Sequence, residues 1–488
     1  MIPLYTWYEA RSGKSRIGKP TSRPLRRFSF PTWSWALCVL AFYLLLGAWA
    51  TGIFGLVAPD ASARTGTAAA ILWSRNPHYG ALLTAWGPLT TGLQLPLVWL
   101  LGVLFNAPQF SANVLSALAS TASLGLLYRL FGVLGFQGRM RWLPVALYAT
   151  NPLILLYAAS GSSASLLITC LLLAIYGLAA WWQSGQPGYL GLSGLGITGA
   201  FLINYESLLF GVVVAAAFLY GLKRRGMAHP LARLTLYIMP IFYTLLFWFA
   251  FNLISMRDPF AFLNADLYVS ANELSGPSGT ATLSSPLGVL NNPGRALVYT
   301  LLLAFVVLIC VLNRRDTGDH DTDIGNATQA KPTIWLALLL AASLGAAVLL
   351  LWPGQSLAQT GPSSGGYSSS SVSVAEEQVV GDYLRSDVLA DARILVDQGD
   401  TYPIIDKAGQ PNRFVIPSDI DYDEIIANAA QDIDYILLRN NDPGKPGAIQ
   451  YAYPMLYESR WPYAQLVHDF GGQMGWRLYR VTQPESKK

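Results

Sequence analysis

Long apolar runs, separated by short polar stretches, dominate roughly the first 350 residues of the chain. Each run has about 18 to 24 residues, which is the length at which an α-helix crosses about 30 Å of hydrocarbon. The pattern therefore predicts a polytopic α-helical membrane protein with about nine spanning helices. The predicted spans are residues 34–57, 112–134, 142–159, 162–183, 188–203, 205–222, 234–255, 295–313 and 333–353.

Residues 88–105 form a weaker apolar stretch, which begins at Pro88 and is interrupted by Pro96. Proline removes a helix hydrogen bond, and a length of about 18 residues is marginal for crossing the bilayer. We therefore expect this stretch to lie at the membrane surface, as part of a long outer loop at residues 58–111 with juxtamembrane helices.

Composition and charge agree with a multi-pass protein of the plasma membrane. The chain is 53% hydrophobic and 12% charged, which is too apolar for an ordinary soluble protein of this length. Seven Lys or Arg residues and one acid, Glu9, precede the first apolar run, and such basic segments stay in the cytoplasm. We read this tail as a topology signal and expect contacts with membrane lipids, not nucleic acid. The later basic clusters that mark cytoplasmic ends are Arg139 with Arg141, Lys223 to Arg225, and Arg314 with Arg315.

The C-terminal part has a different character, because residues 375–488 carry 18 of the chain's 28 acids. The runs ARILVD, YILLRN and WRLYRV are typical of strands and alternate with stretches that favour helices, which predicts a compact α/β sandwich. The parity of the predicted spans places this part outside the cytoplasm. The predicted divisions are a cytoplasmic basic tail at 1–33, a transmembrane domain at 34–354, a Gly/Ser linker at 355–375 and an extracytoplasmic α/β domain at 376–488.

Candidate chemistry is concentrated on the outer side of the predicted topology. Between Glu9 and Asp258 the chain has only two carboxylates, Asp60 and Glu206, and acids near hydrocarbon are costly unless they have a function. The alternatives are purely structural roles, in which Asp60 caps a helix and Glu206 pairs with an arginine.

The first outer loop adds three further polar candidates. Its guanidinium groups, Arg64 and Arg75, suit phosphate oxygens, although snorkelling or lipid contact explains either one as well. His78 is a candidate base or phosphate ligand, but it has no second metal-type partner nearby.

No metal site or cofactor is predicted. The motif D-I-D-Y-D, formed by Asp419, Asp421 and Asp423, resembles a metal-binding D-x-D sequence but leads into YDEIIANAA, where acids favour a helix start. The cysteines lie inside apolar runs without metal-type spacing. No phosphate-binding Gly-rich loop, Ser-His-Asp pattern or Cys-x-x-Cys pair is present.

The order of several segments over about residues 34–260 resembles the GT-C superfamily of membrane glycosyltransferases, such as protein O-mannosyltransferases and aminoarabinose transferases. One spanning helix is followed by an outer acid, Asp60, and by a loop with W-x-P-L at Trp86, Pro88 and Leu89. The segments ANVLSALASTASLGLLYRLFG, ALYATNPLILLYAASG and GLGITGAFLINYESLLFGV follow in the family's order.

The resemblance implies transfer of a sugar from a polyprenyl-phosphate donor to a protein or glycan acceptor on the extracytoplasmic face. In such enzymes the first-loop acid acts as the base, which would be Asp60, and cations such as Arg64 or Arg75 hold the leaving phosphate. Glu206, Tyr205 and His78 are the other expected substrate contacts.

The chain departs from the family pattern at three places. Ala61 stands where members commonly have a second acid, the turn after the third span reads SGSSAS without an acid, and Asn204-Tyr205-Glu206 replaces a lysine. A non-catalytic scaffold or assembly subunit of GT-C shape therefore remains an alternative, and a transporter or flippase is a further one, although no internal repeat supports it.

Overall fold

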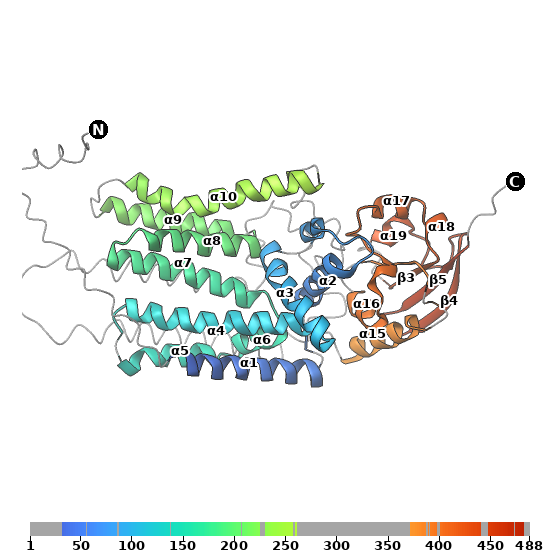
Figure 1. The fold of residues 1–488 in the computed structure, drawn as a ribbon, viewed down its shortest axis with the longest axis horizontal. Helices are drawn as coiled ribbons and strands as arrows, with labels where there is room; N and C mark the ends of the chain where they lie inside the picture. Colours follow the sequence, from blue (N-terminus) through green and yellow to red (C-terminus); the bar gives the residue numbers. More distant parts are fainter. Residues whose placement is uncertain are drawn as a thin grey trace, which may run out of the picture.

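The computed structural model describes residues 32–260 and 371–482, except for residues 55, 85–86, 137, 206, 225–229, 257–258, 387–388, 390, 398–400, 441–447 and 473. The chain forms a helical bundle joined at one end to a small α/β domain (Figure 1). The bundle helices are α1 (Thr32–Phe54), α2 (Pro59–Trp73), η1 (Tyr79–Thr84), α3 (Pro88–Phe105), α4 (Phe110–Val133), η2 (Gly138–Arg141), α5 (Trp142–Ala149), α6 (Pro152–Ser160), α7 (Ala164–Ser184), α8 (Gly188–Ile203), α9 (Ser207–Arg224) and α10 (Pro230–Met256).

The chain is a polytopic membrane protein. Five helices of the described part, α1, α3, α4, α7 and α10, are long and apolar enough to cross a bilayer, and α5 with α6 adds a sixth if this bent pair counts as one span. The predicted runs that fall within the described ranges all form helices. Residues 295–313 and 333–353 lie outside the described residues, so the count of nine spans stays a prediction.

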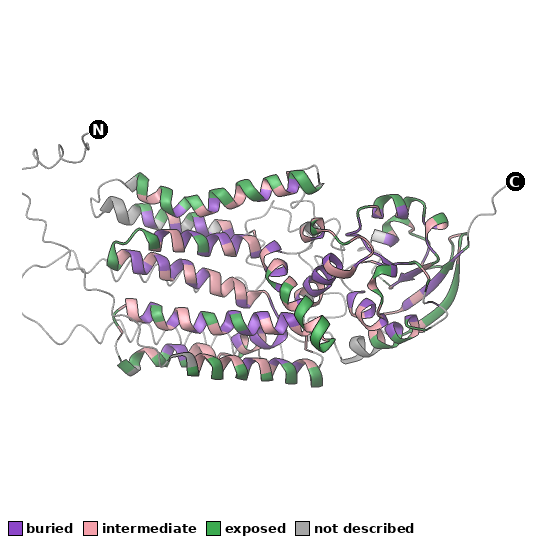
Figure 2. Cartoon of the chain, viewed as in Figure 1, coloured by how far each residue is buried: buried purple, intermediate pink, exposed green. Residues whose placement is uncertain are grey.

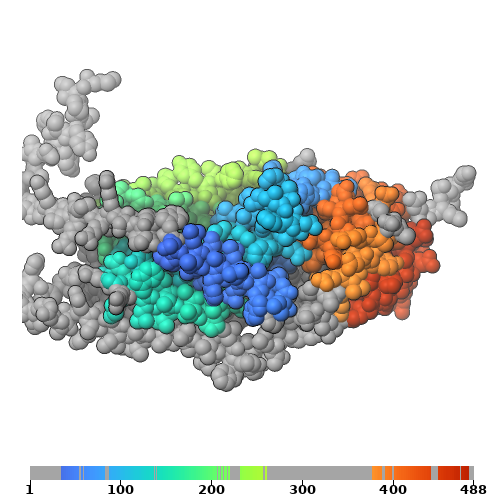
Figure 3. All heavy atoms as spheres, turned by 60° about the horizontal axis from the view of Figure 1, so that its bottom comes forward, coloured from blue at the N-terminus to red at the C-terminus, as the bar shows by residue number. Residues whose placement is uncertain are grey.

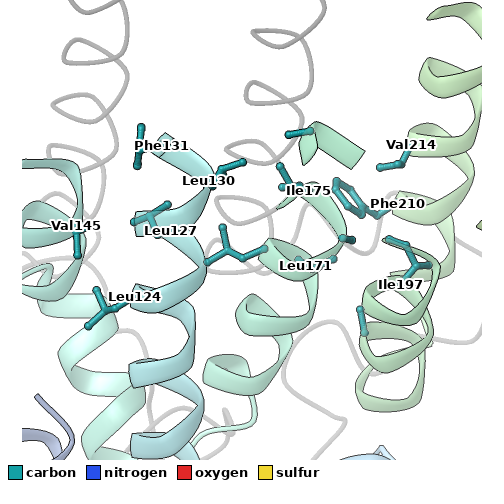
Figure 4. Close-up of a cluster of buried hydrophobic side chains, with 14 of the residues drawn as sticks. Leu124, Leu127, Leu130, Phe131, Val145, Leu171, Ile175, Ile197, Phe210 and Val214 are labelled. Carbon is teal, nitrogen blue, oxygen red and sulfur yellow. The ribbon is translucent and has the colours of Figure 1, made fainter. Parts of the chain in front are cut away.

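The core of the bundle is a continuous apolar cluster between α4, α7, α8 and α9, in which leucine and isoleucine side chains point toward one another (Figure 4). Glycines let the helices come close: a Cβ added at Gly177 of α7 would lie 2.7 Å from the backbone nitrogen of Ser193 in α8. The outermost helices α1 and α10 expose large apolar side chains, such as Leu45 and Phe247 (Figure 2). A lipid environment accounts for that exposure.

The run at 142–159 is broken rather than straight. Its two halves, α5 and α6, are bent by 58°. The side chain of Asn151 accepts a hydrogen bond from the Leu153 N–H (2.9 Å) and so caps α6, while Pro152 occupies the first helical position. Proline there cannot continue the preceding helix but starts a new one readily, which explains the bend.

Helix α3 lies across the end of the bundle (Figure 1). Gly87, just before α3 and with a φ of +64°, packs against the backbone of Ile203 at the end of α8. The other end of α3 leads directly into the start of α4, where Asn113 contacts the backbone of Ala159 near the end of α6. Both ends of α3 are therefore at the same end of the bundle. Length and composition alone would let α3 cross a membrane, so its placement along the surface stays a prediction that this geometry favours.

The C-terminal domain contains a five-stranded mixed sheet in the order β2-β1-β3-β5-β4. Strands β1, β2 and β3 are parallel, and β5 is antiparallel to both β3 and β4. The elements are α15 (Ser371–Leu384), β1 (Ile394–Leu395), α16 (Tyr402–Ala408), η6 (Pro411–Arg413), β2 (Phe414–Val415), α17 (Tyr422–Ala427), α18 (Ala429–Asp432), β3 (Tyr435–Leu438), α19 (Ala448–Ala452), β4 (Ala464–Gly471) and β5 (Trp476–Val481).

Side chains that alternate along the strands build two apolar layers. Ile394 packs with α15 and α16 on one face of the sheet, whereas its neighbour Leu395 packs with α17, α18 and α19 on the other. Each of the three runs that the sequence predicted as strands contains one. Helix α15 begins at Ser371, inside the stretch that the sequence predicted as linker.

The α/β domain sits directly against the part of the bundle that contains α2 and α3 (Figure 3). Helix α2 contacts α16 and η6. The domain is therefore at the same end of the bundle as Asp60.

Candidate functional site

Asp60 stands at the start of α2, at the end of the bundle that faces the α/β domain. Pro59 occupies the first helical position and Asp60 lies in the first turn, where an acid interacts favourably with the helix dipole. The helix begins after Ala58, and no side chain forms a capping hydrogen bond at its start. The structure therefore does not show helix capping by Asp60, which was the purely structural role considered for it from the sequence.

Three donors converge on a single oxygen of Asp60. Its Oδ2 accepts hydrogen bonds from the Ser163 N–H (2.9 Å), the Ser163 hydroxyl (2.6 Å) and Nη2 of Arg64 (3.1 Å). The Asp60 side chain keeps 23% of its surface exposed. The carboxylate is therefore fixed through Oδ2, and among the described residues none donates to Oδ1.

Ser163 reaches Asp60 because the chain turns tightly between α6 and α7. Gly161 ends α6 with a φ of +80°, and a Cβ there would lie 2.9 Å from the Cβ of Ala112 and 3.1 Å from that of Ala61. Only glycine fits this close approach without strain. The sequence placed this turn on the outer side but gave Ser163 no role, since nothing in SGSSAS distinguishes one serine from another.

Arg64 is buried beneath Asp60 rather than aimed at a ligand, since it is only 2% exposed. Its Nε donates to the backbone oxygen of Asp60 (2.7 Å), and its Nη2 donates to the backbone oxygen of Gly161 (2.8 Å) as well as to the Asp60 carboxylate. These contacts tie α2 to the α6–α7 turn. They give Arg64 a role in holding Asp60, and they differ from the phosphate contact expected from the sequence.

Arg75 is engaged by the α/β domain. Its Nη2 forms ion pairs with Asp419 (3.5 Å) and with Asp421, and the Asn76 side-chain amide donates to the same oxygen of Asp421 (2.9 Å). The hydrogen bond from Arg75 lowers the pKa of Asp421, whereas burial raises the pKa of Asp419. A phosphate contact by Arg75 would require it to leave these acids.

The D-I-D-Y-D motif divides between two roles. Asp423 lies in the first turn of α17, as the sequence predicted. Asp419 and Asp421 precede that helix and bind Arg75 instead. Among the described residues, no group of three or more His, Cys, Asp or Glu side chains is arranged to hold a metal ion.

The remaining candidates lie elsewhere on the same end of the bundle. The Nδ1 atom of His78 is 2.7 Å from the Asn76 backbone oxygen, so His78 is part of the loop that carries Arg75. Tyr205 packs against Phe201 and Trp248 in the turn between α8 and α9. Glu206 lies outside the described residues. Within the described part, the ion pairs and hydrogen bonds of Asp60 involve Arg64 and Ser163, not Arg75, His78 or Tyr205.

Two cavities lie near this end of the bundle. The larger, of about 250 Å³, is apolar and lies between α3, α8 and α10, with Leu93, Leu202, Thr244 and Phe247 among its lining residues. The smaller, of about 30 Å³, lies between α2 and the α/β domain. Asp60 lines neither cavity.

The chain matches the dolichyl-phosphate-mannose-protein mannosyltransferase family over residues 93–248, roughly a third of its length. No curated protein matches the chain. The matched region extends from α3 to α10 and begins after Asp60. This family belongs to the GT-C superfamily, so the resemblance inferred from the order of segments is confirmed.

Proposed function

We propose that the protein transfers a sugar from a polyprenyl-phosphate donor to a hydroxyl of a protein or glycan acceptor, on the extracytoplasmic side of the plasma membrane. The observation that carries this proposal is the family match over α3 to α10, because the family is described by a dolichyl-phosphate-mannose donor and a protein acceptor. The bundle end that carries Asp60 is the end that we assign to the outer side, on the evidence of the basic clusters.

The apolar cavity between α3, α8 and α10 suits the lipid part of such a donor. Leu93 and Phe247 at its wall are 43% and 68% exposed, so apolar side chains of the cavity are accessible from the surface of the bundle. An isoprenoid chain offers only apolar surface, and a site of this lining binds it by removing that surface from water. The sugar and phosphate would then extend toward the outer end of the bundle.

In the proposed reaction, Asp60 is the base. The acceptor oxygen attacks the anomeric carbon, the bond from that carbon to the phosphate oxygen breaks, and the polyprenyl phosphate leaves with the bonding electrons. The acceptor proton passes to Asp60. Since Ser163 and Arg64 hold Oδ2, the proton goes to Oδ1.

We propose a changed set of substrate contacts relative to those expected from the sequence. Arg64 becomes the residue that holds Asp60, because it is buried. Tyr205, Glu206 and His78 remain proposed substrate contacts, and Arg75 joins them only in a state in which it has left Asp421.

The second candidate function is a non-catalytic subunit of GT-C shape. It is favoured by one observation: Asp60 lines neither of the two cavities described above, and one of its oxygens accepts hydrogen bonds from three donors. Both readings share the fold and differ in whether donor and acceptor meet at Asp60.

The test is sugar transfer by the purified protein from a short-chain polyprenyl-phosphate mannose to an acceptor peptide or glycan. We expect Asp60→Asn to lower turnover by about 10²- to 10⁴-fold while donor binding persists, because the change keeps the shape of the side chain and removes the proton acceptor together with the charge that pairs with Arg64. Glu458→Gln, at an exposed acid of the α/β domain, is the matched control and should leave turnover unchanged.

Two results would count against this assignment. Wild-type turnover in Asp60→Asn would remove Asp60 as the base. Absence of both transfer and donor binding in the wild-type protein would favour the non-catalytic subunit.

A further inference from the structure

We infer that the α/β domain positions Asp60 from a distance, because it fixes the position of α2, the helix that carries Asp60. This inference rests on the proposed function for its catalytic consequence. Its structural consequence can be measured without any activity.

Helix α2 packs against both the bundle and the α/β domain. The side that contains Ala61 and Thr65 is buried against the bundle, where Ala61 packs with Ala112 of α4 and Thr65 receives a hydrogen bond from Gln94 of α3. A neighbouring side, with Gly66, Ala69 and Ala70, lines the small cavity against the α/β domain. Ala70 is a member of the apolar cluster formed by α15, α16 and the sheet. The domain core is therefore completed by a helix of the bundle.

Gly66 of α2 packs closely against Tyr402 of α16. A Cβ added at Gly66 would lie 2.6 Å from Cγ of Tyr402, which is shorter than any ordinary contact. Tyr402 is 7% exposed and packs with Ala68, Ala69 and Val98. The ring is therefore packed against α2 beside a cavity of only about 30 Å³, and its fit depends on the missing side chain at Gly66.

Polar contacts fasten the domain on two further sides. Arg75 and Asn76, just beyond the end of α2, bind Asp421, and Gln109, just before α4, donates to Asp406 of α16 (2.8 Å). Together with the Tyr402 contact, they hold the α/β domain against the bundle at three places. A body held at three separated points cannot rotate without breaking at least one contact.

The N-terminal half of the same helix carries the Asp60 cluster. Helix α2 has 15 residues and runs without a break from Pro59 to Trp73, so a shift at Gly66 moves Asp60 and Arg64 relative to the fixed turn at Gly161 and Ser163. Reacting groups must be placed to within a fraction of an ångström, and a misplacement of about 1 Å can cost about 100-fold in rate. The domain thus acts on Asp60 without touching it.

The test compares Gly66→Ala with Gly125→Ala. Alanine is the better helix former at both positions, but the added methyl meets Tyr402 only at Gly66, while Gly125 of α4 faces open space. Asp421→Ala is a second variant that weakens the polar contacts without crowding the interface, and Asp469→Ala, which breaks a pair with Arg477 away from it, is the matched control.

Two readouts are taken. Hydrogen exchange of the Ser163 amide, which donates to Asp60, reports the site directly, and exchange in α2 and α16 reports the docking. Transfer assays on the full-length protein then separate kcat from the KM for the donor. We expect faster Ser163 exchange in Gly66→Ala and Asp421→Ala. In Gly66→Ala we also expect a kcat lower by about 10- to 100-fold and an unchanged donor KM.

The inference would be overturned if hydrogen exchange became faster in α2 and α16 while Ser163 exchange and kcat stayed at their wild-type values. Wild-type exchange throughout α2 in both interface variants would also overturn it, since docking would not depend on these contacts. If the wild-type protein transfers no sugar, the proposed function fails, and the exchange of Ser163 still decides whether the domain positions the site.

Discussion

At the residue scale, Asp60 and Arg64 form an ion pair that is compatible with their spacing in the sequence. Their spacing of four residues puts both on one side of a helix, where opposite charges meet. The scarcity of acids was enough to single out Asp60. The role of Arg64 depends on its burial under the α6–α7 turn, which follows from a contact with Gly161 about 100 residues away, and no local pattern reports such a contact.

We predict that Arg64→Ala lowers the stability of the protein by about 1–3 kcal/mol, because it removes several buried hydrogen bonds and leaves the Gly161 backbone oxygen without its donor. Arg64→Lys keeps the charge but lacks the planar fork, so it should restore only part of the loss. The measurement is thermal unfolding in detergent together with the KM for the donor. A raised donor KM at unchanged stability would instead identify Arg64 as a phosphate ligand.

At the scale of elements, apolar length was a reliable guide to helices and a poor guide to their direction. The runs at 112–134 and 162–183 correspond to α4 and α7 within a few residues. The run at 142–159 has the same length but breaks, because Asn151-Pro152 starts a second helix inside it. Helix α3 shows the converse, since its apolar length permits a crossing while the contacts of its two ends lie at the same end of the bundle.

The placement of α3 predicts that the residues before and after it are on the same side of the membrane. Tyr79 and Asn106 are both exposed and flank α3. With the three native cysteines replaced, Tyr79→Cys and Asn106→Cys should both react with a membrane-impermeant maleimide added to intact cells. Reaction of one position only, with the other reacting after the membrane is opened, would show that α3 crosses.

At the scale of the whole molecule, the sequence predicts two domains but gives no sign that helix α2 of the bundle contributes to the packing of the α/β part. Composition marks the change from apolar to acidic segments, and the strand runs are marked by short stretches of apolar, β-branched and aromatic residues. One contact between α2 and the α/β domain joins Gly66 and Tyr402, which are more than 300 residues apart in the sequence. Neither residue is distinguished from its neighbours in its own segment. Contacts of this kind are set by the packed structure alone.

The last prediction concerns the orientation of the molecule. The α/β domain contacts α2 and is therefore on the Asp60 side, whereas the loop between α7 and α8 is at the opposite end of the bundle (Figure 1). The basic N-terminal tail and the clusters near Arg141 and Arg224 assign that opposite end to the cytoplasm, because basic segments are retained there. Tyr451, which is 80% exposed, should then face outward, and Gln186 of the α7–α8 loop should face inward.

Single-cysteine variants at these two positions decide the orientation. In intact cells an impermeant maleimide should label Tyr451→Cys and leave Gln186→Cys unlabelled, and permeabilised cells should show both. The reverse pattern would place Asp60 and the α/β domain in the cytoplasm. That outcome would also exclude the outer-leaflet lipid donor on which the proposed reaction depends, because the donor's sugar would then be on the other side of the membrane from the proposed base. Labelling at both positions in intact cells would mean that the bundle end at Gln186 is exposed outside, which the basic clusters disfavour.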